Sequence, residues 1–182
     1  MMRIATNDDL VWVAELQRGL FAEHAIPLPI LRDWYRANPN GFRIVRAANG
    51  ERIGHVDVLP IRADALQRFV AGEIAEREIA GSSLHPPEER ALVRDLYIES
   101  VIVLGESKAA HDAGVAELRQ ALPSIFASLG EPERLRDVYA AGATPAGNRF
   151  LQRLGFAHIG DDDRADHLLM YRVGYAELLP SS

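Results

Sequence analysis

Apolar residues along the first part of this chain follow a helical period. An apolar position every third or fourth residue predicts a helix that begins near Asn7, after a short extended start over 3–6. Asn7, Asp8 and Asp9 supply a cap and negative charge at its start. A second, short helix is expected over 31–37. The apolar face of the first helix consists of Leu10, Val13, Leu16 and Leu20.

A period of two then takes over and predicts a β-hairpin. Its strands are expected over 42–46 and 52–59, and Asn49-Gly50 between them is a strong hairpin-turn signal. A helix over 63–72 and a long strand over 92–104 follow. Glycines, serines and prolines interrupt 73–90, which is left without an assigned element.

The last third predicts two further helices and three strands. A helix is expected over 109–129, kinked or split at Pro123. A strand at 138–141 leads to a helix of about ten residues, with Thr144 as N-cap and Pro145 in its first turn. Gly155 can end this helix in a left-handed conformation. A final hairpin is expected from three segments, namely 156–160, a turn at 161–164, and 167–173.

The element order β, α, α, β, β, α, β, α, β, α, β, β predicts an α/β (α+β mixed sheet) fold: a central mixed sheet of about seven strands flanked by helices. The 182 residues are 48% apolar and 25% charged, which suits one globular domain. No apolar run is long enough to span a membrane and no secretory pattern opens the chain, so we expect a cytoplasmic protein without a membrane partner.

Composition also narrows the chemistry. The absence of cysteine excludes disulfides and a cysteine nucleophile. A net charge of −6 argues against a nucleic-acid surface and would suit a cationic substrate. The six histidines show no metal-ligand spacing, and Asp161-Asp162-Asp163 fits a polar turn better than a metal site, so no metal is expected.

The stretch DVYAAGATPAGNRFLQRLGF, residues 137–156, resembles the end of the catalytic domain in the GNAT superfamily of acyl-CoA N-acyltransferases. In that family a strand feeds a helix that closes in Leu-Gly-Phe. The opening RIATNDDL and the order of elements over nearly the whole chain resemble the same fold. The resemblance implies one N-acetyltransferase domain over 1–182. It would move an acetyl (acyl) group from acetyl-CoA, as co-substrate, to a small-molecule or peptide amine by direct attack in a ternary complex. A homodimer is left open.

By the same resemblance, the fourth strand and the helix after it would hold acyl-CoA. The pyrophosphate turn would lie in 107–116. His111, Gly114 and Ala116 occupy the positions of the family pattern, but the first position is usually Gln or Arg, so the turn is degenerate. A second register starts at Lys108 and lacks the middle glycine. Asn148 could contact the cofactor arm, although capping or surface exposure explains it equally well. The residues expected along the pantetheine are Val101, Ile102, Val103 and Leu104.

A carboxylate near the end of the fourth strand can act as general base, and Glu99 is the candidate. Strand alternation predicts that Tyr97, Glu99, Val101 and Val103 share one face. Tyr97 is the second catalytic candidate. Core packing is the alternative for Tyr97, and an arginine ion pair at a sheet edge is the alternative for Glu99. Leu151 occupies the position at which the family usually keeps a tyrosine acid.

Two other readings remain at this point. A GNAT fold that has lost catalysis and serves as a ligand-sensing or interaction domain would account for Leu151 and the degenerate turn. A mixed α/β domain unrelated to CoA would be favoured if the fourth and fifth strands were fully paired. Glu73, Glu76 and Glu78 could hold a cationic amine, with a solvated acidic face as the better explanation.

Overall fold

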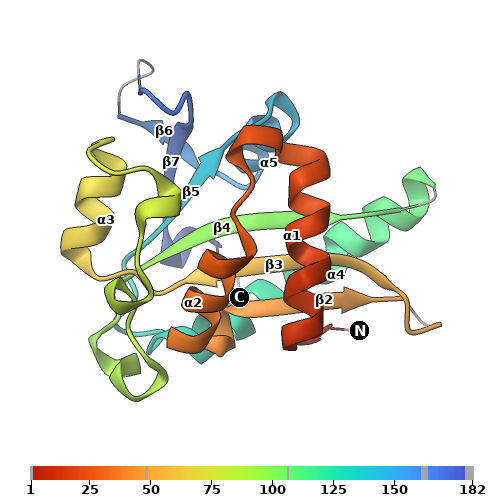
Figure 1. Ribbon diagram of the computed structural model, residues 1–182, viewed down its shortest axis with the longest axis horizontal. Helices are drawn as coiled ribbons and strands as arrows, with labels where there is room; N and C mark the ends of the chain where they lie inside the picture. Colours follow the sequence, from red (N-terminus) through yellow and green to blue (C-terminus); the bar gives the residue numbers. More distant parts are fainter. Residues whose placement is uncertain (1, 48, 106, 161–163, 179–182) are drawn as a thin grey trace.

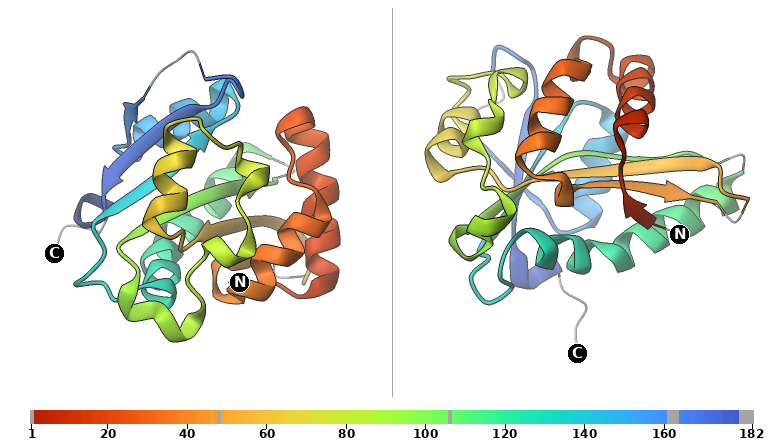
Figure 2. Two further views of the ribbon diagram at one scale, coloured as in Figure 1. Left: turned by 60° about the vertical axis from the view of Figure 1, so that its left-hand side comes forward. Right: turned by 60° about the horizontal axis from the view of Figure 1, so that its bottom comes forward.

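The computed structural model describes residues 2–47, 49–105, 107–160 and 164–178. Its centre is a mixed seven-stranded sheet in the order β1-β2-β3-β4-β5-β7-β6. One helical layer covers one face and a second layer covers the other (Figures 1 and 2). The strands are β1 (Met2–Ile4), β2 (Phe42–Arg46), β3 (Arg52–Leu59), β4 (Asp95–Val103), β5 (Asp137–Gly142), β6 (Ala157–Ile159) and β7 (Leu169–Gly174). The mixed-sheet fold class expected from the sequence is confirmed.

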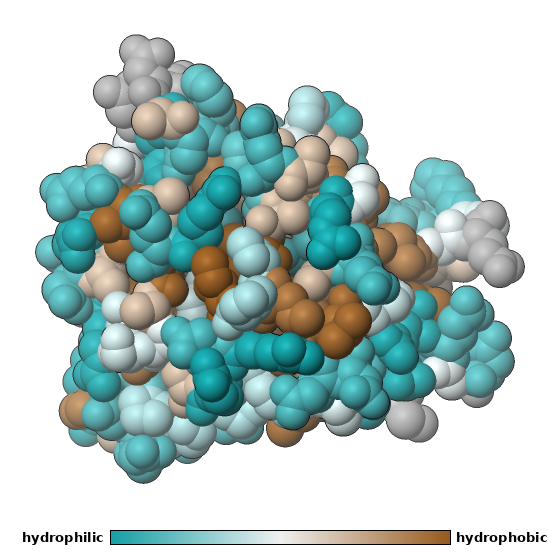
Figure 3. Space-filling view, viewed as in Figure 1, coloured by the Kyte–Doolittle hydropathy of each residue, from teal (hydrophilic) through white to brown (hydrophobic). Residues whose placement is uncertain are grey.

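Two hydrophobic cores lie on the two faces of the sheet. The first packs under three helices, α1 (Asn7–Phe21), α2 (Leu28–Ala37) and α3 (Ala63–Val70). The second packs under α4 (Lys108–Leu129) and α5 (Pro145–Arg153). The face that bears α1 to α3 shows apolar surface near its middle, bordered by hydrophilic residues (Figure 3). No helix in the described ranges is long and apolar enough to cross a bilayer.

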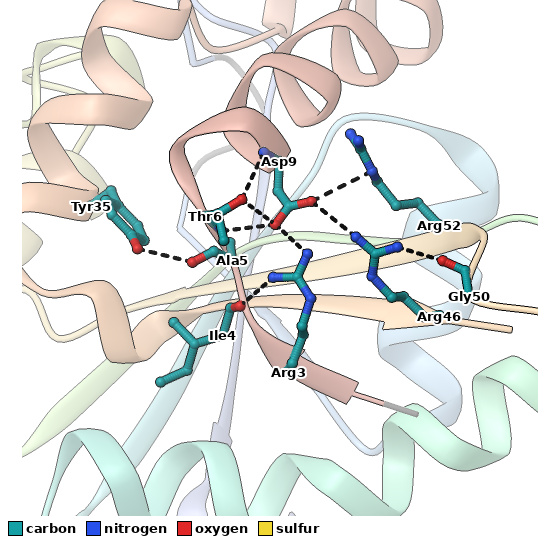
Figure 4. A network of polar contacts seen from close by, with 9 residues as sticks. All are labelled: Arg3, Ile4, Ala5, Thr6, Asp9, Tyr35, Arg46, Gly50 and Arg52. Atoms are coloured by element: carbon teal, nitrogen blue, oxygen red, sulfur yellow. Dashed lines mark hydrogen bonds and ion pairs between the residues drawn. The ribbon is translucent and has the colours of Figure 1, made fainter. Parts of the chain in front are cut away.

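A buried carboxylate fastens α1 to the N-terminal strands. Asp9, 1% exposed, closes a capping box with Thr6, which is the N-cap in place of the expected Asn7–Asp9 cluster. Its two oxygens lie 2.6 Å from Arg3 Nη2, 3.6 Å from Arg46 Nη2 and 3.4 Å from Arg52 Nε (Figure 4). Because these arginines come from β1, β2 and β3, they fix the position of α1 over the sheet.

The hairpin and the C-terminal helix form as their local signals predict. Gly50 has φ 84° in the hairpin turn, and Gly155 has φ 89° after α5. Thr144 Oγ1 accepts a hydrogen bond from Gly147 N at 3.0 Å and caps α5. Helix α4 is one continuous helix through Pro123, so of the two outcomes expected there, a kink or a split, the split does not occur. Residues Asp161 to Asp163 of the expected final turn lie outside the described residues.

Residues 73–90, which no pattern assigned, form three short 3₁₀ turns: η3 (Glu76–Glu78), η4 (Gly81–Ser83) and η5 (Pro87–Leu92). They are held by tertiary contacts. Trp34 Nε1 donates to Ile79 O at 2.6 Å, and Gly81 N donates to Asp33 Oδ2 at 2.6 Å. A further 3₁₀ turn, η1 (Ala22–His24), follows α1, and Arg77 Nη2 donates to its Glu23 O at 2.8 Å. This contact ties η3 to the end of α1.

Strands β4 and β5 separate partway along their length. Parallel pairing joins Asp95–Ile98 to Asp137–Ala140 and then stops, although β4 continues to Val103 and β5 to Gly142. On its other side β4 stays paired with β3 as far as Val103. The reading that required fully paired fourth and fifth strands is therefore not favoured.

Candidate active site

A cavity of about 600 Å³ occupies the gap between the separated strands. This size is typical of a small-molecule or cofactor site. Its walls come from both strands, from α4 and α5 on one side of the sheet, and from the end of α1 on the other. The cavity thus connects the two helical layers through the sheet.

Glu99 lies in a β-bulge at the point where the strands part. Asp57 of β3 pairs with Ser100, and Val58 pairs with Ile98, so Glu99 is the extra residue. Its two carboxylate oxygens accept hydrogen bonds from Gln17 Nε2 at 3.1 and 3.2 Å. Gln17 is itself buried, and its Oε1 accepts from Ile26 N at 3.2 Å. Glu99 is therefore held by an amide of α1, and not by the arginine considered as its alternative partner.

The bulge corrects the prediction that four residues of β4 share one face. Tyr97 packs in the core beneath α1 to α3, and Glu99 turns to Gln17 on the same side. Val101 and Val103 pack against the core beneath α4 and α5. One extra residue shifts the alternation, because strand side chains alternate with a strict period of two. Glu99 consequently lies on the opposite side of the sheet from Val101 and Val103, two of the proposed cofactor-contacting residues.

The surroundings of Glu99 favour its protonated form. Burial raises the pKa of this carboxyl well above its usual range, and the nearby charges of Glu76 and Asp57 raise it further. The hydrogen bonds from Gln17 act in the opposite direction. A carboxylate with a raised pKa is a stronger base than an ordinary surface glutamate.

Tyr97 packs in the hydrophobic core beneath α1 to α3, which was the alternative to a catalytic role, and it also makes a polar contact. Its hydroxyl donates to Glu76 Oε1, and its ring lies edge-on to Phe69 at 5.1 Å. Burial raises the pKa of Tyr97 well above 10, helped by the charge of Glu76. Tyr97 is not among the described residues that line the cavity.

Glu76 is the one residue of the acidic segment that reaches the cavity lining. Burial raises the pKa of Glu76 to about 7 against the opposing hydrogen bond from Tyr97. Glu73 forms an exposed ion pair with Arg68 at 3.7 Å, and Glu78 caps Ala75 N at 2.7 Å. The acidic run alone could not distinguish these three carboxylates, because their separation depends on how η3 folds over the sheet.

A buried polar pair beside Glu99 was missed from the sequence. His55 Nδ1 lies 3.1 Å from Asp57 Oδ2, and both residues are at most 1% exposed. Asp57 Oδ2 and Ser100 Oγ have no hydrogen-bond partner among the described residues. Polar residues at alternate positions of an otherwise apolar strand, His55 and Asp57 of HVDV, were the available signal.

Three of the four residues expected along the pantetheine line the cavity: Val101, Ile102 and Val103. Leu104 is outside the lining, 37% exposed, and its N–H donates to Ile53 O at 2.6 Å. Beyond Ile98, the side of β4 that faces β5 has no strand partner within the described ranges. That strand edge is available to an extended ligand with amide groups.

Helix α4 begins at Lys108 and so includes most of the residues that were expected to form the pyrophosphate turn. Ser107 is its N-cap, so the motif residues lie within the helix rather than in a loop. His111 lines the cavity, whereas Ala116 is exposed and outside its described lining. Gly114 is buried against β4, and a Cβ at this position would lie 2.5 Å from Val103 Cγ1. Its role is therefore the close approach of α4 to β4.

The first turn of α4 fits an anion better in the register that starts at Lys108. The first N–H groups of a helix lack partners within the helix, and here they belong to Lys108 and the residues just after it. Lys108 Nζ pairs with Asp112, an exposed ion pair that a phosphate could replace at little cost.

Helix α5 contributes both expected and unexpected residues. Asn148 lies outside the described lining, and its Oδ1 would clash with a Cβ on Gly142. Leu151 is 7% exposed and lines the cavity. Arg149 and Arg153 also line it, and no motif in the sequence distinguished them. Tyr139 and Tyr171 do not contribute to the described lining.

The described residues contain no group of three or more His, Asp or Glu that could hold a metal ion. This arrangement combines a free strand edge, a helix N-terminus with basic side chains nearby, and a high-pKa carboxylate across the gap. It can bind an extended anionic thioester on one side of the sheet and accept a proton on the other.

No protein-family model and no curated protein matches the sequence. The structure, however, is similar to many solved structures over nearly its whole length. A GNAT-like decarboxylase, GphF, in complex with isobutyryl-CoA has a TM-score of 0.64 at 15% identity, covering 96% of this chain and 99% of that one. The loading GNATL domain of CurA from Lyngbya majuscula has a TM-score of 0.61 at 12% identity, covering 97% and 98%.

A GNAT-family acetyltransferase from Listeria monocytogenes has a TM-score of 0.54 at 13% identity, covering 96% of this chain and 94% of that one. Several other matches are N-acetyltransferases by name. Identities this low relate the structures through their fold. The seven-stranded mixed sheet, with its fourth and fifth strands parted around a cavity, therefore gives this chain the GNAT acetyltransferase fold.

Proposed function

We propose that this protein is an acyl-CoA-dependent N-acetyltransferase that moves an acetyl (acyl) group to a primary amine of a small molecule or peptide. The observation that carries the proposal is the cavity through the sheet, with a free β4 edge on the α4 side and Glu99 on the α1 side. Two substrates could enter from opposite faces and meet where the strands part.

Acetyl-CoA would lie on the α4–α5 side. Its pantetheine amides would pair with the free backbone of β4, beside Val101 and Val103. Its phosphates would lie near the first turn of α4, with Lys108, and near Arg149 and Arg153 at the wall. In this arrangement His111 lies beside the phosphates, and Gly114 keeps the helix close to the strand.

Acyl transfer would proceed by direct attack in a ternary complex. The amine nitrogen uses its lone pair to form a C–N bond with the thioester carbonyl carbon, and the C–S bond then breaks to release the thiolate of CoA. Glu99 takes the proton that the amine loses, directly or through water. Gln17 holds both oxygens of Glu99 and so fixes the direction of the base.

Leu151 leaves the site without a tyrosine at the usual acid position, and the reaction tolerates this. An alkyl thiol has a pKa of roughly 8.5, so a thiolate can depart without simultaneous protonation and take its proton from solvent. Tyr97 is not suited to the task, because its hydroxyl is bonded to Glu76 on the α1 side.

The second candidate is a GNAT fold that binds its ligand without turnover, as a sensing or interaction domain. Leu151 at the acid position and the placement of the motif residues within helix α4 favour it. Both candidates require acyl-CoA binding, and only the first requires transfer.

The test is calorimetric titration with acetyl-CoA, followed by thiol release across a panel of primary amines. The proposed enzyme binds acetyl-CoA and releases thiol only when an amine is present. Glu99→Gln should lower kcat by roughly 10²- to 10⁴-fold with little change in binding. Glu15→Gln, the same change on the exposed side of α1, is the control and should retain activity. Failure to bind any acyl-CoA at millimolar concentration would refute both candidates, and binding without transfer would leave the sensing domain.

A further inference from the structure

The α1 side of the cavity contains more carboxylates than the proposed reaction uses. Glu99 is held on β4, and Glu76 reaches the same lining from η3. Tyr97 lies two residues before Glu99, and its hydroxyl donates to Glu76 Oε1. Tyr97 thus holds one oxygen of the Glu76 carboxylate. The other Glu76 oxygen accepts no hydrogen bond within the described part of the chain.

The cationic side chains near Glu76 are already engaged elsewhere. Arg77 donates to Glu23 O at 2.8 Å. Arg164 donates to both oxygens of Asp166 and to the carbonyls of Phe69 and Val70. Neither guanidinium forms an ion pair with Glu76, so the charge of Glu76 has no close partner among the described residues.

A second, independent observation indicates a ligand that donates hydrogen bonds. Ser100 lines the cavity and is 3% exposed, yet its hydroxyl has no partner among the described residues. Opposite it across the β3–β4 pair, the buried Asp57 Oδ2 lies 3.1 Å from His55 Nδ1, a close polar neighbour. Buried polar atoms usually have partners. An ammonium group carries three donors and no acceptor, which suits these oxygens.

Part of the cavity wall on the α1 side is apolar, and His24 of η1 also contributes to the lining there. Leu20 and Phe21 line the cavity from the last turn of α1, one turn beyond Gln17. Leu168 lines it as well. These side chains can cover a hydrocarbon segment but offer nothing to a hydroxyl or a peptide group. The face that α1 and α2 cover also shows apolar surface in its middle (Figure 3).

From these observations we infer that the acceptor is a short aliphatic diamine or a longer amine of that type, with one amino group at Glu99 and a second, charged group at Glu76. This inference rests on the proposed acyl transfer and narrows its substrate class. The reacting nitrogen gives its proton to Glu99, whereas the distant ammonium stays protonated and pairs with Glu76. The methylenes between them lie along Leu20 and Phe21.

The experiment compares two acceptors that differ in the second charge alone, 1,4-diaminobutane and butylamine, with acetyl-CoA as donor. The wild-type protein should show a kcat/KM for the diamine at least about tenfold higher, the ratio expected for one charge-assisted hydrogen bond. Glu76→Gln, which keeps an acceptor for Tyr97, should reduce this ratio to near one. Glu73→Gln changes the same charge on an exposed residue of the same segment and should keep the ratio.

Equal kcat/KM values for the two amines in the wild-type protein would overturn the inference and leave the proposed acyl transfer standing. A preference that survives in Glu76→Gln would also overturn it. If neither amine is acetylated but other primary amines of the panel are, the inference fails and the proposed function stands. If no amine of the panel is acetylated, the proposed function fails, and calorimetry then tests the diamine site by itself. Binding of 1,4-diaminobutane that Glu76→Gln abolishes would support that site, and no binding to the wild-type protein would overturn it.

Discussion

Replacement of Glu76 by glutamine should raise the free energy of unfolding relative to the wild-type protein, and this difference should grow as the pH rises from 5 to 8. Burial raises the pKa of Glu76 from 4.5 to about 7, and Asp166 adds to this effect, while Tyr97, Arg164 and Arg77 oppose it. The folded protein therefore keeps a proton that the unfolded chain has lost between these two pH values. Folding stability from this group is greatest below pH 4.5 and falls as the pH rises through 7.

The magnitude follows from the two pKa values. Between pH 5 and pH 8 this one group should lower the free energy of unfolding of the wild-type protein by roughly 2–3 kcal/mol. Glutamine has no charge to bury and can still accept the hydrogen bond from Tyr97. The Glu76→Gln variant should therefore lose less free energy of unfolding between pH 5 and pH 8 than the wild-type protein does. The difference equals the contribution of Glu76 and corresponds to roughly 5–10 °C in Tm for a chain of this length.

The assay is urea unfolding of wild type, Glu76→Gln and Glu73→Gln at pH 5 and pH 8. Glu73 is exposed and paired with Arg68, so its replacement should leave the pH dependence close to that of wild type. If wild type and Glu76→Gln lose the same free energy of unfolding between pH 5 and pH 8, Glu76 is not buried as the structure has it.

Three further changes test other parts of the site. Asp57→Asn removes a negative neighbour that raises the pKa of Glu99, so the rise of kcat/KM with pH should move to lower pH; an unchanged midpoint in the pH–rate profile would contradict this. Gly114→Ala places a Cβ against Val103 and should cost about 1–3 kcal/mol in urea unfolding and weaken acetyl-CoA binding; wild-type values for both would contradict the close packing of α4 on β4. Arg149→Ala should weaken acetyl-CoA binding roughly several-fold in calorimetry, most strongly at low salt, and equal binding at all salt concentrations would remove Arg149 from the phosphate site.

Local signals were sufficient for most of the elements. The hairpin around Gly50, the cap at Thr144 and the left-handed Gly155 each depend on a few neighbouring residues, and each forms as expected. The prediction that failed on β4 assumed unbroken alternation. A bulge is set by how β4 pairs with β3, and pairing between segments some 40 residues apart leaves no mark on the strand itself.

The sequence by itself determined the element order, the mixed sheet and the presence of a carboxylate at position 99, because periodicity, caps and turns act over short distances. Only the tertiary structure decided how that carboxylate is used. It parts β4 from β5, places Gln17 over Glu99, and brings Glu76 from an unassigned segment into the same cavity. It also raises the pKa of both carboxyls, because burial and neighbouring charge are properties of the assembled fold rather than of the local sequence.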